Sequence, residues 1–134
     1  MPADVDPEAL LAALVLAPGT YPRNRFLELY KDPAMKRVRR RAAQLRGLVR
    51  QLAGRSGMIA THVQASARAD GGRTLRYQLE TLTLRAEVAL EPLEAAILDV
   101  ALAQAKGETA PVESRARVDA ALLRLSAGSS ARTG

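Results

Sequence analysis

The sequence predicts an α+β fold with N-terminal helices, a three-stranded antiparallel meander and two C-terminal helices. Apolar residues recur at steps of three and four from Met35 to Leu52, which is typical of an amphipathic helix. Apolar and polar residues alternate in three successive runs between Met58 and Glu91, which is typical of half-buried strands. The chain has 134 residues, 48% of them hydrophobic, so it has room for one core.

The first helix is predicted to begin at Asp6. This residue supplies a side-chain cap, Pro7 suits the first helical position, and Glu8 places an acid in the first turn. The apolar residues that follow at helical spacing are Leu10, Leu11, Leu14 and Val15. A short second helix is expected from Arg23 to Tyr30.

A long Arg-rich amphipathic helix is predicted to begin at Asp32 and Pro33 and to end before Gly54. One apolar stripe runs along it, formed by Met35, Val38, Ala42, Leu45, Val49 and Leu52. At about 100° per residue, a separate face collects the basic residues Lys36, Arg39, Arg40, Arg46 and Arg50.

The segment from Met58 to Glu91 has two interpretations. As strands, it forms three alternating runs with turn chemistry at residues 70–72. As a helix, it would make the chain an all-α bundle, because a three/four pattern also fits Leu75, Leu79, Leu82, Ala86, Ala89 and Leu93. The helix places Pro92 in a helical interior, which costs about 3 kcal/mol. Strands are therefore favoured, with Pro92 at the first position of the next helix.

The C-terminal part is predicted to hold two helices. One begins at Pro92 and ends at Gly107, and the other runs from about Val112 to Leu125. Residues 1–125 are expected to form a single globular domain, and the small, polar residues 126–134 a disordered tail. The apolar faces of the sheet and of the basic helix are expected to pack together, which leaves the arginines in water.

Positive charge is concentrated in one stretch of the chain. Nine basic residues and a single acid, Asp32, lie between Lys31 and Arg55, whereas the whole chain has a net charge of +6. Arginine binds phosphate through charge-assisted and often bidentate contacts. We therefore expect a non-enzymatic binding protein that contacts nucleic-acid backbone, largely independently of sequence. The predicted nucleic-acid-binding residues are Lys36, Arg39, Arg40, Arg46 and Arg50.

Other interpretations of this face stay open. Nearly all basic residues are arginine and alanine is abundant, so the face is also compatible with an ordinary solvated helix surface. Alternatively, the chain is an interaction or adaptor subunit that uses the apolar stripe or a sheet edge to form a homo-oligomer or to dock on an acidic protein. A membrane partner is disfavoured because no Trp or Phe flanks the stripe. The aromatic content of 3% disfavours single-strand binding by aromatic stacking.

Catalytic and metal-binding residues are not predicted. The chain has no cysteine, and His62 is its only histidine. Glu91 and Glu94 lie where a helix begins, a place where acids stabilise the helix dipole, so a structural role is expected for them. We expect no enzymatic activity, no cofactor and no metal.

A cytoplasmic location is expected from the N-terminal sequence. Acidic residues stand where a signal peptide has its positively charged region. The longest apolar run, residues 9–17, is too short to span a bilayer.

Overall fold

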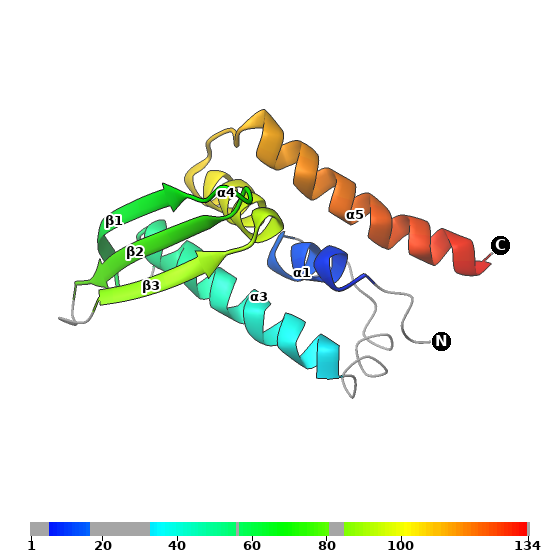
Figure 1. The fold of residues 1–134 in the computed structure, drawn as a ribbon, viewed down its shortest axis with the longest axis horizontal. Coiled ribbons are helices and arrows are strands. Elements are labelled where there is room, and N and C mark those ends of the chain that lie inside the picture. Colours follow the sequence, from blue (N-terminus) through cyan, green and yellow to red (C-terminus); the bar gives the residue numbers. More distant parts are fainter. Residues whose placement is uncertain (1–5, 17–32, 56, 81–84, 134) are drawn as a thin grey trace.

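The computed structural model describes residues 6–16, 33–55, 57–80 and 85–133. Within these ranges, the sheet lies at one end of the molecule and the helices lie beside and behind it (Figure 1). The helices are α1 (Pro7–Leu16), α3 (Pro33–Leu52), α4 (Pro92–Lys106) and α5 (Val112–Thr133), and the strands are β1 (Ala60–Ala67), β2 (Arg73–Leu79) and β3 (Arg85–Leu90). The α+β prediction is confirmed, and the all-α alternative is wrong.

Helix α1 is the centre of the helical layer. It begins as predicted, because the Asp6 carboxylate accepts a hydrogen bond of 2.8 Å from the Glu8 backbone N–H. Residues 9–14 are all buried, and α1 contacts α3, α4 and α5. A helix that is apolar on every side belongs in such a central position. The short helix expected at residues 23–30 lies outside the described residues.

The predicted apolar stripe of α3 faces the core of the protein. Met35, Ala42 and Leu45 are buried, together with Leu48, which the stripe did not include. The other stripe residues, Val38, Val49 and Leu52, pack against the same core. Most of this contact is with α1. The chain leaves the helix near Gly54, which has a positive φ of 73° that favours glycine.

The three strands form an antiparallel sheet in the order β1-β2-β3. The turn between β1 and β2 falls at residues 70–72 as predicted, where Gly71 has a φ of 89° and the Asp70 carboxylate accepts a 2.8 Å hydrogen bond from the Gly72 N–H. Leu75, Val88 and Leu90 belong to the core cluster. The sheet therefore joins the helices through β2 and β3.

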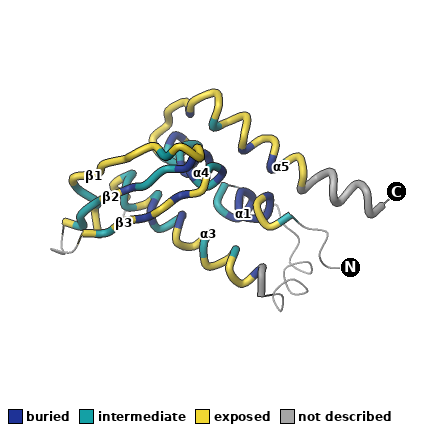
Figure 2. Tube along the Cα trace, in the orientation of Figure 1, coloured by how far each residue is buried: buried dark blue, intermediate teal, exposed yellow. Residues whose placement is uncertain are grey.

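The expected packing of the whole apolar face of the sheet is wrong for β1. Every residue from His62 to Ala67 is exposed, and the exposed fraction of Val63 is 43%. In Figure 2 the β1 tube is coloured as exposed over most of its length. The physical reason is position, because within the described sheet the core cluster reaches only β2 and β3, and β1 is the edge strand on the far side of β2.

The two C-terminal helices follow the predicted order. Helix α4 begins at Pro92, and the Glu91 N–H just before it donates a hydrogen bond of 2.8 Å to the Glu94 carboxylate. The helix is followed by Gly107, which has a positive φ of 70°. Helix α5 does not end at Leu125, as the sequence predicted, but continues to Thr133. Residues 126–133 contain one glycine and no proline, so the segment lacks a strong helix breaker. The boundaries of the domain stay a prediction.

Candidate functional site

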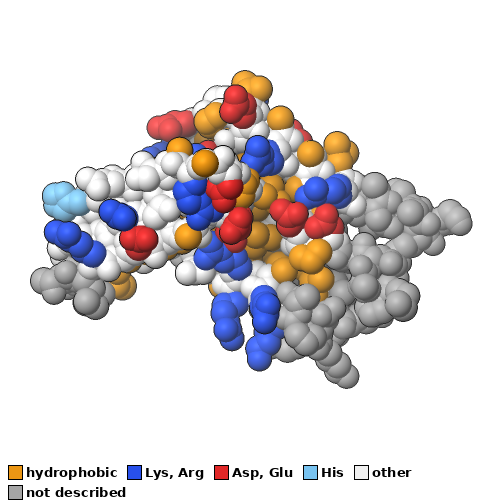
Figure 3. Space-filling model, viewed as in Figure 1, with side chains coloured by type: hydrophobic (Ala, Val, Ile, Leu, Met, Phe, Trp, Pro, Cys, Tyr) orange, Lys and Arg blue, Asp and Glu red, His pale blue; other side chains and the backbone are white. Residues whose placement is uncertain are grey.

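Helix α3 carries seven basic residues and no acid. Five of the seven are exposed, and we call these five the basic face: Lys36, Arg37, Arg39, Arg40 and Arg50. Four of the five predicted nucleic-acid-binding residues belong to this face, and the fifth, Arg46, does not. Figure 3 shows basic side chains projecting from the part of the surface where α3 lies.

Arg46 lies at the border between the basic face and the core. Its side chain is part-buried, and its Nη1 donates a hydrogen bond of 3.0 Å to the backbone carbonyl of Leu14. Leu14 is in the last turn of α1, where carbonyl groups lack helical partners and a positive charge is favourable. Arg46 therefore caps α1, a structural role that the sequence prediction missed.

Arg41 is also directed inward. Its Nε and Nη2 donate to the Glu94 carboxylate at 2.5 and 2.9 Å, and Nη2 also reaches the Ala89 carbonyl at 2.6 Å. These contacts join α3 to the start of α4 and the end of β3. A signal was present in the sequence, because at about 100° per residue Arg41 falls on the side of the apolar stripe. An arginine on that side predicts an acidic partner within the fold.

Four of the five basic side chains on this face have no acidic partner among the described residues. Among the described residues, no acid forms an ion pair with Lys36, Arg37, Arg40 or Arg50. Five acids pair with arginines elsewhere: Glu94, Asp70, Asp99, Glu87 and Asp6. From Lys36 to Arg50 the helix rises about 21 Å at about 1.5 Å per residue. The face thus spans about four helical turns, with four of its residues between Lys36 and Arg40 and with Arg50 at the other end.

Two other residues considered in the sequence, His62 and Glu94, lie on separate elements. His62 is exposed on β1. Glu94 stabilises the start of α4 as expected and also pairs with Arg41. The described part of the chain contains no group of three or more His, Cys, Asp or Glu residues placed to hold a metal ion.

Comparison with protein-family models, with curated proteins and with solved structures gave no match. Among the described helices, none is both long and apolar enough to cross a membrane.

Proposed function

We propose that this protein binds nucleic acid through the basic face of α3, mainly by contacts to phosphate groups. The observation that carries the proposal is a 20-residue helix with seven basic residues and no acid. Four of these side chains, those of Lys36, Arg37, Arg40 and Arg50, are exposed and have no acidic partner among the described residues. Duplex DNA presents about one negative charge per 1.7 Å of its axis, so a face of this length meets several phosphates.

The position of two of these charges on the helix supports the binding of an anionic partner. Lys36 and Arg37 lie close to the N-terminus of α3, which begins at Pro33. The helix dipole is positive at that end, where basic side chains are unfavourable and anions are favourable. A bound phosphate would remove this conflict, whereas solvent alone only screens it.

The contacts of the α3 arginines support different roles for them. Arg40 and Arg50 are exposed and belong to the binding group. Arg46 is held by the Leu14 carbonyl and Arg41 by Glu94. We therefore propose that substitution of Arg40 or Arg50 affects binding more than stability, and that substitution of Arg41 does the reverse.

The test is fluorescence anisotropy of a labelled random-sequence duplex, titrated at several salt concentrations with the double variant Arg40→Glu/Arg50→Glu. The slope of log affinity against log salt is negative, and each lost phosphate contact makes it shallower by about 0.9. We expect the slope of the variant to be shallower by about two and its affinity at low salt to be at least tenfold lower. The matched control is Lys106→Glu/Arg117→Glu, which changes the net charge equally at exposed positions on α4 and α5.

Circular dichroism establishes that each variant is folded before its binding is compared. If both double variants lose affinity equally, net charge rather than the basic face explains binding. If folded Arg40→Glu/Arg50→Glu binds the duplex like the unsubstituted protein, the proposal is wrong.

An interaction-subunit function is the second candidate, and the exposed edge strand favours it. The apolar stripe of α3 is buried within the chain, so this alternative depends on β1. The exposed fractions of Ile59 and Val63 are 39% and 43%, and an open strand edge pairs readily with another chain. Light scattering on the purified protein tests self-association, and a strict monomer at high concentration counts against a homo-oligomer.

A further inference from the structure

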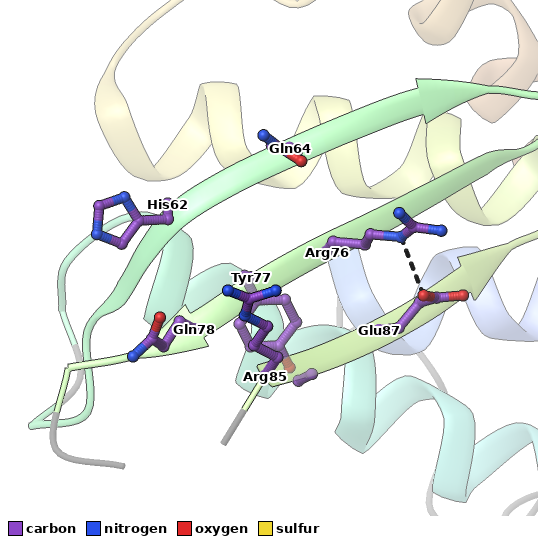
Figure 4. Close-up of a pocket in the computed structure, with 8 residues that line it drawn as sticks. His62, Gln64, Arg76, Tyr77, Gln78, Arg85 and Glu87 are labelled. Carbon is purple, nitrogen blue, oxygen red and sulfur yellow. Dashed lines mark hydrogen bonds and ion pairs between the residues drawn. The ribbon is translucent and has the colours of Figure 1, made fainter. Parts of the chain in front are cut away.

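The sheet carries a hollow that the basic face of α3 does not include. It has a volume of about 670 Å³, within the range of ligand pockets in proteins. In Figure 4 the helices lie behind the strands, and the polar side chains stand over the strands on the open side. The polar residues that line the hollow are His62, Gln64, Arg76, Gln78, Arg85 and Glu87.

Strand register arranges these side chains in two rows. Gln64, Arg76 and Glu87 are partners across the three strands, and the Arg76 Nε lies 3.0 Å from a Glu87 carboxylate oxygen. Gln78 and Arg85 form the next row. Rows two residues apart are separated by about 6.6 Å, at about 3.3 Å per residue. The open face is therefore a regular array of amide and guanidinium groups.

A β-bulge places His62 at the margin of the hollow. The pairing shifts between Thr61 and Gln64, so that two residues of β1 stand opposite Tyr77 alone. Among the described residues, His62 is the only non-glycine with a positive φ, at 51°. Bulges redirect side chains, and backbone strain of this kind gathers at functional sites. The labelled ring of His62 lies at one end of the array (Figure 4).

We propose that this hollow binds an unpaired nucleotide of a single-stranded nucleic acid. The proposal rests on the proposed function, because it takes nucleic acid as the partner. Arg76 and Arg85 outnumber the one acid of the hollow, Glu87, so the charge favours an anion. The amides of Gln64 and Gln78 each offer a donor and an acceptor, which matches the edge of a nucleobase.

The same chemistry distinguishes an unpaired nucleotide from other anionic partners. In a duplex the Watson–Crick edges are occupied, whereas splayed bases present these edges to amides and stack on guanidinium planes. The carboxylates of an acidic peptide match the charge, but they only accept hydrogen bonds and so do not use both the donor and the acceptor of each glutamine amide. Figure 3 shows basic side chains over the sheet and in the region of α3 from one side of the molecule, so a single strand can reach both. Tyr77 and Ala86 also line the hollow, but Tyr77 packs against the hydrophobic core. Recognition here therefore depends on amides and arginines rather than on aromatic stacking.

The test compares a labelled mixed-sequence single strand with a duplex of equal length, by fluorescence anisotropy. The variant is Gln64→Ala/Gln78→Ala, which removes both amides without changing the charge. The matched control is Ser66→Ala/Thr74→Ala, a cross-strand pair on the same face that does not line the hollow. We expect the glutamine variant to bind the single strand at least tenfold more weakly, because two well-formed base contacts together discriminate by that order or more. We expect its duplex affinity, and both affinities of the control, to be unchanged.

The outcomes separate this inference from the proposed function. If the glutamine variant binds the single strand like the unsubstituted protein, or if the unsubstituted protein does not bind a single strand, the inference is wrong. In either case, loss of duplex binding in Arg40→Glu/Arg50→Glu still supports the basic face. If a labelled polyglutamate peptide binds the glutamine variant more weakly than the unsubstituted protein, and the single strand does not, the hollow binds an acidic protein segment. The inference is then overturned.

Discussion

Arg41 and Glu94 form a two-point ion pair across the interface of α3 and α4, with N–O distances of 2.5 and 2.9 Å. The side chains are 25% and 12% exposed, so the pair is largely shielded from solvent. Arg41 also donates to the Ala89 carbonyl, and Glu94 accepts from the Glu91 N–H. Arg41 therefore connects α3 with α4 and β3 and does not belong to the basic face.

We expect Arg41→Ala to lower the free energy of unfolding by about 2 kcal/mol, because it leaves a shielded carboxylate without its charged partner. Arg41→Lys should fall between Ala and the unsubstituted protein, since an ammonium group cannot reproduce the two-point geometry. Urea unfolding measures all three proteins. The control is Arg37→Ala on the basic face, which should change stability by less than about 0.5 kcal/mol. Equal effects at positions 37 and 41 would contradict the structural role of Arg41.

Two glycines should respond in opposite directions to substitution by alanine. Gly47 lies inside α3, and a Cβ there would meet no atom within 4 Å. Gly47→Ala should therefore stabilise the protein by about 1 kcal/mol, because alanine is the better helix former. A Cβ at Gly72 would lie 2.5 Å from the Leu90 carbonyl oxygen and in collision with the Arg68 guanidinium.

Gly72→Ala should accordingly destabilise the protein and disturb the contact of Arg68 Nη2 with the Leu90 carbonyl, which is 2.8 Å in the structure. Thermal unfolding of the two variants provides the comparison. A midpoint for Gly72→Ala equal to that of the unsubstituted protein would show that the turn tolerates a side chain. A lower midpoint for Gly47→Ala would show that the backbone of α3 needs glycine for another reason.

Local signals made most of the elements predictable. The starts of α3 and α4 follow from Pro33 and Pro92, and the end of α4 follows from Gly107. These signals act within a few residues of the chain, so the sequence contains them in full. The alternation of apolar and polar residues was enough to predict β2 and β3. Their inward residues do reach the core, as the alternating pattern requires.

Features that depend on distant contacts were not predictable in the same way. Arg46 and Leu14 are 32 residues apart in the chain, so the withdrawal of Arg46 from the predicted basic face is decided by how α3 packs against α1. The exposure of Val63 depends on how far the helices extend under the sheet. The bulge at His62 was also missed, since the alternation in β1 is regular in the sequence and the pairing with β2 shifts it.

The turn between β1 and β2 should make stability depend on pH through Asp70. A hydrogen bond from the Gly72 N–H, and after it the nearby Arg68, lower the pKa of Asp70 below its ordinary value. A carboxyl whose pKa is lower in the folded state stabilises the protein above its unfolded pKa, and this stabilisation is lost as pH falls through the folded pKa. Asp70→Asn keeps an oxygen for Gly72 but removes the charge. We expect the variant to be less stable than the unsubstituted protein at pH 7 and the difference to close below about pH 4.

Urea unfolding of both proteins at neutral pH and near pH 3 measures this difference. Asp119→Asn is the control, because it removes the same charge from an exposed position on α5 and leaves the turn intact. Subtracting its effect removes the general influence of net charge, so the remainder reports the turn. A difference between Asp70→Asn and the unsubstituted protein that is equal at both pH values would show that the charge of Asp70 does not stabilise the turn. In that case the hydrogen bond to Gly72, which a neutral oxygen also accepts, would be sufficient to hold β1 against β2.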